Sequence, residues 1–247
     1  MSKNSTPAII LAAGRGSRMQ SNIAKVLHIL AEKPMILYTL ENLQEANFDP
    51  IVLVVGYKGE DVRRTVNKFF KSEIIFARQD EALGTGDALK RGLEKLGGVV
   101  GAVLAINGDD SAFYKPGTLK SFLASHIKSG AIASFVVVRH SSPGNLGVVR
   151  KDKNGNVLKI EDYMGETSAS EVNAGAYLFD SRWLAKNIDK IQKNEKGEYY
   201  IIELVNSAIA QGEKVDTFRV DPDEWLGINT QEDLRIADQK MKEKLRK

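Results

Sequence analysis

The sequence predicts an α/β fold with a mixed, mostly parallel sheet, helices on both faces and a small β-rich lobe. Apolar strand candidates alternate with helix candidates through the first 110 residues, which is typical of a parallel sheet. These strand candidates are continuous apolar runs, as expected for strands buried on both faces. In the second half, a strong turn signal at residues 152–156 separates two short strand candidates, as in a hairpin. Together these features indicate a Rossmann-like frame carrying an inserted lobe.

The first half of the sequence predicts parallel strands whose following loops converge at one rim of the sheet. Its expected strands are residues 8–12, 51–55, 74–76 and 103–106, and its expected helices are residues 34–48, 60–70 and 85–96. Pro34 suits the first turn of its helix, where a missing N–H costs nothing. Ligands in such folds bind beyond the carboxyl ends of the strands. We therefore expect the loops after the first and fourth strands to meet at one rim.

The second half alternates less regularly. Its expected strands are residues 133–139, 147–150, 157–161, 172–179 and 214–220, and its expected helices are residues 115–129, 182–191, 199–211 and 230–246. Thr230 is suited to cap the final helix, with Asp233 three residues later. Because no stretch of linker-like composition divides the chain, we expect a single domain over residues 1–247.

Composition excludes several classes of protein and site. The 247 residues include 43% hydrophobic and 27% charged side chains, the balance of an ordinary globular protein. A net charge of +3 is too mild to favour nucleic acid as a partner. The chain has no cysteine, which excludes disulfides, thiolate metal sites and a cysteine nucleophile. With no long apolar stretch and a polar N-terminus, we expect a cytoplasmic protein without membrane contact.

A glycine-rich turn with three cations follows the first strand candidate. Gly14 and Gly16 allow the backbone to approach a ligand closely and to direct N–H groups toward it. The cations of this region are Arg15, Arg18 and Lys25. Such a loop suits a polyanion like a nucleoside triphosphate. Met19 stands where a dinucleotide fingerprint needs its third glycine, and no P-loop Gly-Lys-Ser/Thr follows. The alternative is an ordinary turn with solvated charges.

Two further loops are expected at the same rim. Asp109 ends an apolar strand, and a carboxylate there is a natural Mg²⁺ ligand, because Mg²⁺ prefers oxygen atoms and completes its shell with phosphates. Residues 84–86 open a helix, so their N–H groups face the rim. Gln79 carries a donor and an acceptor that can read the imide edge of a pyrimidine. Taken alone, these loops also fit a strand-end turn and a threonine-capped polar loop.

Together these segments resemble the sugar-1-phosphate nucleotidyltransferases, and most closely the uridylyltransferase domain of the bifunctional bacterial enzymes that make UDP-N-acetylglucosamine. The resemblance covers residues 8 to about 240. Its motifs occur in the family's order at residues 11–19, 25–28, 79–86, 108–109, 146–149, 160–161, 171–175, 197–200 and 227–229.

The resemblance implies a role for each matching position. The residues implied in catalysis are Arg18, Lys25 and Asp109. Those implied in nucleotide binding are Leu11, Ala12, Ala13, Gly14, Lys25, Gln79, Gly84, Thr85, Asn107, Gly108 and Asp109. Those implied in sugar binding are Gly147, Glu161, Asn173 and Tyr200. Asp109 and Asn229 would hold Mg²⁺ as the cofactor.

The implied reaction transfers a uridylyl group from UTP to a sugar-1-phosphate, with N-acetylglucosamine-1-phosphate as the expected acceptor. The attacking phosphate is already ionised, so positioning and charge neutralisation suffice and no general base is needed. The single domain would then comprise a nucleotide-binding half to about residue 110, a sugar-binding half over about residues 111–228, and a C-terminal helix over residues 229–247. UTP and the sugar phosphate are the expected partners. Of the two activities of the bifunctional enzymes, we expect the uridylyl transfer and not the acetyl transfer.

Three departures from the family pattern leave alternatives open. Asn107 stands where the family has tyrosine, Asp110 and Ser111 replace an apolar residue and proline, and Ile202 replaces a threonine near the sugar. The alternatives are another nucleotide (dTTP, CTP or GTP), another acceptor such as glucose-1-phosphate, or a sugar-nucleotide-binding regulator without turnover. The final helix could also pack against a second copy, so a homo-oligomer stays open.

Overall fold

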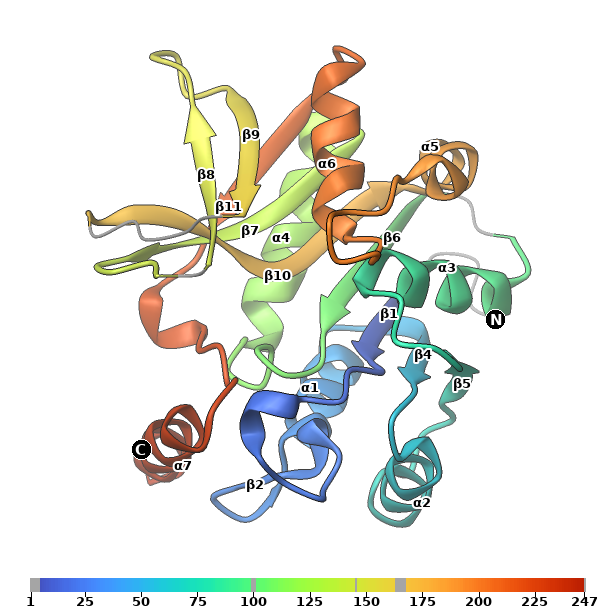
Figure 1. Ribbon diagram of the computed structural model, residues 1–247, viewed down its shortest axis with the longest axis vertical. Coiled ribbons are helices and arrows are strands. Elements are labelled where there is room, and N and C mark those ends of the chain that lie inside the picture. The colour runs from blue at the N-terminus through green and yellow to red at the C-terminus, as the bar shows by residue number, and fades with distance from the viewer. Residues whose placement is uncertain (1–4, 99–100, 145, 163–167, 247) are drawn as a thin grey trace.

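A single mixed sheet forms the centre of the molecule, as the computed structural model in Figure 1 shows. The structure describes residues 5–98, 101–144, 146–162 and 168–246. Within these residues, nine strands join one sheet, in which seven follow the order β11-β7-β10-β6-β1-β4-β5 and the β8–β9 hairpin is attached through β10. The strands are β1 (Thr6–Ala12), β4 (Phe48–Val55), β5 (Ile75–Arg78), β6 (Ala102–Asn107), β7 (Ala133–His140), β8 (Gly147–Lys151), β9 (Val157–Asp162), β10 (Ser170–Asp180) and β11 (Val215–Arg219).

The first half of the sheet is parallel and the second half is mixed. Strands β6, β1, β4 and β5 run parallel, so their carboxyl ends share one edge. Strand β10 is antiparallel to both β6 and β7, whereas β11 is parallel to β7. The predicted α/β class and the mixed, mostly parallel sheet are therefore confirmed.

Helices cover both faces of the sheet, because side chains of the central strands alternate between two apolar cores. Ile10 packs into one core with the helices α1 (Met35–Glu45), α2 (Gly59–Phe69), α4 (Pro116–Ser129) and α7 (Gln231–Leu245). Ile9 packs into the other with α3 (Thr85–Leu96), α5 (Ser181–Asn187) and α6 (Ile201–Ala210). Both isoleucines are fully buried, which explains why this strand is apolar at every position.

The β8–β9 hairpin forms the β-rich lobe at the top of Figure 1. Its turn is closed by the Asp152 carboxylate, which accepts hydrogen bonds from the backbone N–H groups of Asn154 (2.8 Å) and Asn156 (2.9 Å). Helix α6 holds the lobe in place through Asn206, whose side chain both accepts from the Ile160 N–H (2.9 Å) and donates to the Ile160 carbonyl (3.0 Å). The lobe is thus tied to the same helix that borders the site described below.

Several boundaries differ from the sequence-based expectations for physical reasons. Helix α1 ends at Glu45, three residues early, because Asn47 adopts a left-handed conformation (φ 65°) before β4 begins. Helix α6 begins at Ile201 because Tyr199 is held outside it, bonded to the backbones of Leu83 and Gly86 (2.7 Å each). The predicted cap of the final helix is confirmed as a capping box between Thr230 and Asp233.

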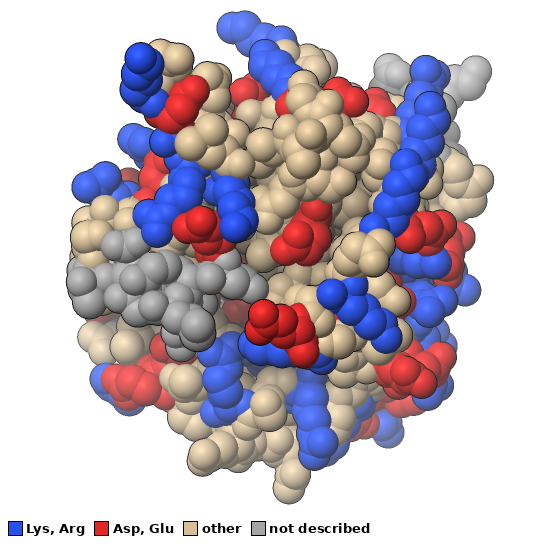
Figure 2. All heavy atoms as spheres, turned by 45° about the horizontal axis from the view of Figure 1, so that its top comes forward, with Lys and Arg blue, Asp and Glu red and all other residues tan. Residues whose placement is uncertain are grey.

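Small elements without a strong sequence signal complete the chain. They are the short β2 (Ile29–Leu30) and β3 (Lys33–Pro34) ribbon and 3-10 turns at Ser17–Met19, Lys25–Leu27, Ile188–Lys190 and Pro222–Glu224. In the part of the chain that the structure describes, no helix combines the length and apolar character that a bilayer crossing requires. On the face shown in Figure 2, blue Lys and Arg side chains are interspersed with red carboxylates.

Candidate nucleotide and metal site

A cavity of about 530 Å³ opens at the carboxyl ends of β1 and β6. Most residues with an implied role line it: Leu11, Ala13, Gly14, Arg18, Lys25, Gln79, Gly84, Thr85, Asn107, Asp109, Tyr200 and Asn229. Ala12 and Gly108 lie behind the residues that line the cavity. Ala12 is buried in the core below, and the Gly108 N–H donates to the Leu11 carbonyl (2.9 Å), which joins the ends of the two strands.

The glycine-rich loop wraps closely around Lys25. Gly16 has a left-handed conformation (φ 62°), and a Cβ added to it would lie 2.9 Å from the Lys25 Cβ. Glycine is required there by both the backbone and the close approach. A Cβ added to Gly14 would meet no atom within 4 Å, so this residue faces open space in the cavity. The loop therefore has one glycine that packs against Lys25 and one that leaves room for a ligand.

Four polar side chains meet beside this loop. The Lys25 ammonium forms an ion pair with the Asp109 carboxylate and donates to Asn229 Oδ1 (2.8 Å). Arg18 Nη2 donates to the same Asn229 oxygen (2.9 Å). Asn229 is positioned by α7, because its backbone N–H donates to the capping carboxylate of Asp233 (2.9 Å). The structure thus brings together the three residues implied in catalysis and the second residue implied in metal binding.

The donor set at this point suits a cation. The Asp109 carboxylate and the Asn229 amide oxygen already converge on one positive charge, that of Lys25. Both are oxygen donors of the kind that Mg²⁺ prefers. Among the described residues, no group of three or more His, Asp or Glu side chains could hold a metal by itself. A Mg²⁺ held by Asp109 and Asn229 would thus need further oxygen ligands, which substrate phosphates supply in many enzymes.

Asp110 lies behind the site and is not part of the cavity lining. Its Oδ2 accepts a hydrogen bond from Asn107 Nδ2 (3.2 Å), and its Oδ1 is buried. Burial, reinforced by the negative charge of Asp109, raises the pKa of Asp110 well above its usual range. Gly175, with φ 72°, provides the space for this carboxyl group, since a Cβ on Gly175 would overlap both of its oxygens. Asp110, a departure from the family pattern, therefore fits because Gly175 has no side chain.

The loop that precedes α3 forms the opposite wall. The Gln79 side chain is buried, and its Nε2 donates to the Gly84 carbonyl (3.0 Å) and to Asp87 Oδ2 (2.8 Å). Both hydrogens of the amide therefore bond within the protein. The sequence predicts that Gln79 offers a ligand both a donor and an acceptor, but these contacts leave its oxygen, the acceptor, for a ligand. The Thr85 hydroxyl accepts from the Ile201 N–H (3.0 Å), which links α3 to the start of α6.

The residues implied in sugar binding divide into two groups. Tyr200 lines the cavity, whereas the other three lie beyond its lining: Gly147 and Glu161 on the lobe strands β8 and β9, and Asn173 on the neighbouring β10. These three are neighbours: Glu161 pairs in register with Val148, and a Cβ on Gly147 would lie 3.7 Å from the Asn173 Cβ. The Glu161 carboxylate accepts from Arg150 Nε (2.9 Å).

Tyr177 connects the two groups and was not expected from the sequence. It lines the cavity, and its hydroxyl accepts a hydrogen bond from Asn173 Nδ2 (2.5 Å). Ile202, at one departure from the family pattern, also lines the cavity. In sequence, Tyr177 belongs to an apolar strand and reads as a core residue, so no local signal distinguishes it.

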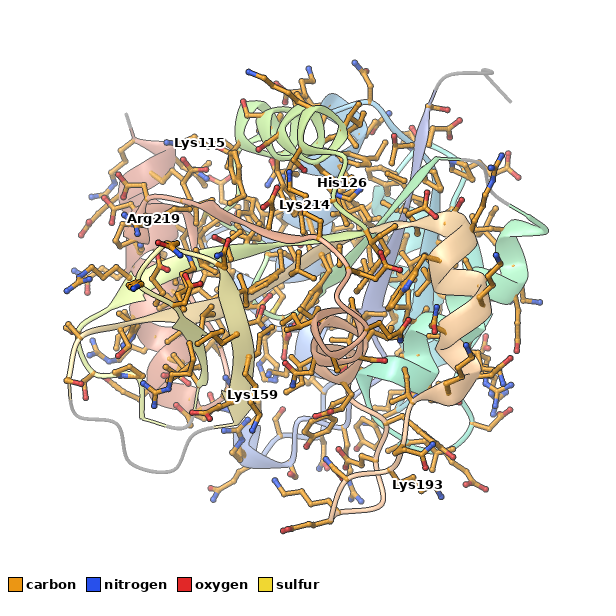
Figure 3. The ribbon with its side chains drawn as sticks, turned by 90° about the horizontal axis from the view of Figure 1, so that it is seen from above. Lys115, His126, Lys159, Lys193, Lys214 and Arg219 are labelled. Carbon is orange, nitrogen blue, oxygen red and sulfur yellow. The ribbon has the colours of Figure 1, made fainter. Side chains whose placement is uncertain are left out.

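The edge of the lobe is held by charges around Glu171. Arg219 on β11, labelled in Figure 3, donates from Nε to Glu171 Oε1 (2.7 Å), and Lys151 on β8 contacts Glu171 Oε2 (2.8 Å). Burial opposes ionisation of Glu171, but the hydrogen bonds from Lys151 and Arg219 outweigh it and lower the pKa of Glu171 below its usual value. This ion-pair network ties the lobe to the edge of the central sheet.

Comparison with known proteins identifies the family of the chain. The nucleotidyl transferase family profile matches residues 7–244. The protein "Bifunctional protein GlmU" of Clostridium novyi is 33% identical over 94% of this chain and 51% of its own length. The protein of the same name from Pelobacter propionicus is 37% identical over 93% of this chain and 51% of its own length. The chain thus spans about half the length of these curated relatives.

A solved structure shares the fold. The crystal structure assigned as a glucose-1-phosphate thymidylyltransferase from Bacillus anthracis superposes with a TM-score of 0.82 at 22% identity, covering 95% of this chain and 94% of that one. The family match over almost the whole sequence shows that the chain belongs to the nucleotidyl transferase family.

Proposed function

We propose that this chain is a Mg²⁺-dependent uridylyltransferase that acts on a sugar-1-phosphate, with N-acetylglucosamine-1-phosphate as the expected acceptor. The observation that carries the proposal is the meeting of Arg18, Lys25, Asp109 and Asn229 in the same cavity as Gln79. Cations, two oxygen ligands for a metal and a base-reading side chain are the groups that a nucleoside triphosphate requires. The reaction class is that of the family to which the chain belongs.

We assign the parts of the nucleotide to different walls of the cavity. The base lies near Gln79 and Gly84, and the phosphates lie over the glycine-rich loop between Gly14 and Arg18. Helix α3 begins at Thr85, so the positive end of its dipole adds partial positive charge on this side. Lys25 and Arg18 supply full charges. This arrangement supports a nucleotide-binding half that corresponds to the first 110 residues.

The chemistry then requires no base from the protein. An oxygen of the sugar phosphate attacks the α-phosphorus of UTP, a new P–O bond forms, and the α–β phosphoanhydride bond breaks to release pyrophosphate. The attacking oxygen is already anionic, so catalysis rests on alignment and on neutralising charge. Arg18 and Lys25 stabilise the charge that builds on the departing pyrophosphate. Mg²⁺ held by Asp109 and Asn229 would neutralise phosphate charge and polarise the phosphoryl group under attack.

The acceptor sugar lies toward the lobe, within the half of the domain that begins after residue 110. Tyr200, Tyr177 and Ile202 border this end of the cavity. The apolar side chain of Ile202 suits the methyl group of an acetamido substituent, which supports N-acetylglucosamine-1-phosphate over glucose-1-phosphate. Asn173 reaches the same region through its hydrogen bond to Tyr177.

A pyrophosphate-release assay across nucleotides and acceptors tests the proposal. We expect turnover with UTP and N-acetylglucosamine-1-phosphate in the presence of Mg²⁺. The matched pairs are dTTP, CTP and GTP with the same acceptor, and UTP with glucose-1-phosphate. Faster turnover with another pair would reassign the substrates within the family. Absence of release with every pair, from protein that binds nucleotide, would instead support a regulator that has lost turnover.

A further inference from the structure

The orientation of the Gln79 side chain is determined by two acceptors. Its Nε2 lies 3.0 Å from the Gly84 carbonyl oxygen and 2.8 Å from Asp87 Oδ2. A carbonyl oxygen and a carboxylate oxygen accept hydrogen bonds and do not donate them. Turning the amide over would place Oε1 against both of them. The amide nitrogen must therefore face Asp87 and Gly84, and Oε1 is the polar atom that these contacts leave for a ligand.

Asp87 is well placed to impose this orientation. It lies in the first turn of α3, where the helix dipole favours a negative charge. Its side chain is only 9% exposed, and its two oxygens have different partners: Oδ2 accepts from Gln79, and Oδ1 faces Arg91 Nη2 at 3.3 Å. Arg91, one turn later, holds the carboxylate in place through this ion pair. Asp87 is not among the cavity-lining residues, so it acts through Gln79.

We infer that Asp87 is a positioning residue that makes Gln79 present an acceptor to the base, so that the site selects uracil or thymine over cytosine. The inference rests on the proposed function, since it assumes that the base lies at Gln79. Uracil and thymine carry an N–H at ring position 3, which can donate to Gln79 Oε1. Cytosine has an unprotonated nitrogen at that position, so two acceptors would face each other. Discrimination by such a repulsive contact is a common source of specificity.

Two substitutions of Asp87 separate positioning from general stability. Asp87→Ala removes the acceptor and frees the amide of Gln79 to turn over. Asp87→Asn keeps the volume but replaces an acceptor-only group with one that can also donate. The matched control is Asp80→Ala, which removes a carboxylate from the same loop. Asp80 is exposed and pairs with the exposed Arg78 (2.7 Å), away from the Gln79 amide.

The test measures the dissociation constants of UTP and CTP by titration calorimetry and pyrophosphate release with each nucleotide. We expect the wild-type protein to bind UTP at least tenfold more tightly than CTP. Asp87→Ala should lower this ratio by about tenfold, the equivalent of ~1.4 kcal/mol, with a smaller reduction for Asp87→Asn and none for Asp80→Ala. A purely structural role would weaken both nucleotides equally and leave the ratio unchanged.

The outcomes distinguish this inference from the proposed function. A ratio that Asp87→Ala and Asp87→Asn both leave unchanged would overturn the positioning role, even if UTP is turned over normally. Wild-type protein that binds CTP as tightly as UTP would overturn it as well. Conversely, selective binding of UTP without pyrophosphate release would support the positioning role and contradict the proposed enzyme. Failure to bind either nucleotide would overturn both.

Discussion

Asp109 and Asn229, which are distant in the sequence, are joined by the single ammonium group of Lys25. Lys25 Nζ forms an ion pair with Asp109 and donates to Asn229 Oδ1 over 2.8 Å. Asp109 follows strand β6, and Asn229 immediately precedes the cap of α7. The structure therefore holds two side-chain oxygens, of the kind that Mg²⁺ prefers, around one positive charge. The predictions below follow from this arrangement and from the contacts that support it.

Asp109→Asn should reduce turnover by roughly 100-fold or more, within the range seen when one charge-stabilising group is removed from an active site. The substitution keeps the shape of the side chain but removes the charge that pairs with Lys25 and would hold Mg²⁺. Steady-state pyrophosphate release and the circular dichroism spectrum would be compared with wild type. Near-normal turnover in a folded variant would show that Asp109 is not the metal ligand.

Gly16→Ala should destabilise the glycine-rich loop and raise the KM for the nucleotide. A Cβ there would lie 2.9 Å from the Lys25 Cβ, on a backbone with φ 62°. The matched control is Gly212→Ala, because Gly212 also has a positive φ of 75° but no atom within 4 Å of an added Cβ. Each should lose about 1 kcal/mol of stability from the backbone alone. Only Gly16→Ala should also raise the KM, and equal effects of both variants on KM would refute the packing argument.

Thr85→Val should loosen the start of α6 and weaken nucleotide binding. The variant keeps the shape of the side chain but leaves the Ile201 N–H without the oxygen it now meets at 3.0 Å. A hydrogen bond of this kind is worth about 1 kcal/mol, which thermal unfolding can detect. Thr85→Ser restores the hydroxyl and should recover most of the loss. If Ser and Val behave alike, the hydrogen bond contributes nothing measurable.

Glu171→Gln should lower stability at neutral pH and have less effect in acid. The folded-state pKa of Glu171 is below its usual value, because the hydrogen bonds from Lys151 and Arg219 outweigh burial. The stabilisation is therefore fully present above about pH 4.3, the ordinary pKa of glutamate, and is lost as the pH falls through the lower folded-state pKa. We expect a difference of about 1–2 kcal/mol at pH 7, since hydrogen bonds to charged groups are the stronger ones.

Urea unfolding of wild type and Glu171→Gln at several pH values between 3 and 7 would measure this difference. Glu213→Gln is the matched control, because Glu213 is an exposed carboxylate just after α6. It should change stability little at any pH. A Glu171→Gln effect that stays constant down to pH 3 would contradict the ion-pair explanation.

Much of the fold was predictable because local patterns and tertiary structure agree. The run Ile9–Leu11 is apolar at every position because both faces of β1 are buried, and it leads into the glycine-rich loop that lines the cavity. The capping box of α7 is a local hydrogen-bond pattern, so Thr230 and Asp233 could be recognised in advance. In such places a few neighbouring residues determine the structure.

The remainder depends on contacts between distant segments. Tyr177 reads as an ordinary strand residue, and only the approach of Asn173 and the cavity give its hydroxyl a role. The direction of the Gln79 amide follows from Asp87, eight residues later in the first turn of α3. Asp110 directly follows Asp109 in the sequence, but it packs behind the site against Gly175. No local pattern carries these relationships.

The most direct test of the account is to identify the products formed from UTP and N-acetylglucosamine-1-phosphate. Mass spectrometry of a reaction with Mg²⁺ should show UDP-N-acetylglucosamine and pyrophosphate in equal amounts, and neither product without the sugar phosphate. The Asp109→Asn protein should form both at least roughly 100-fold more slowly. Release of phosphate or pyrophosphate from UTP alone, or no UDP-sugar from any acceptor tested, would contradict the claim that this site transfers a uridylyl group to a sugar phosphate.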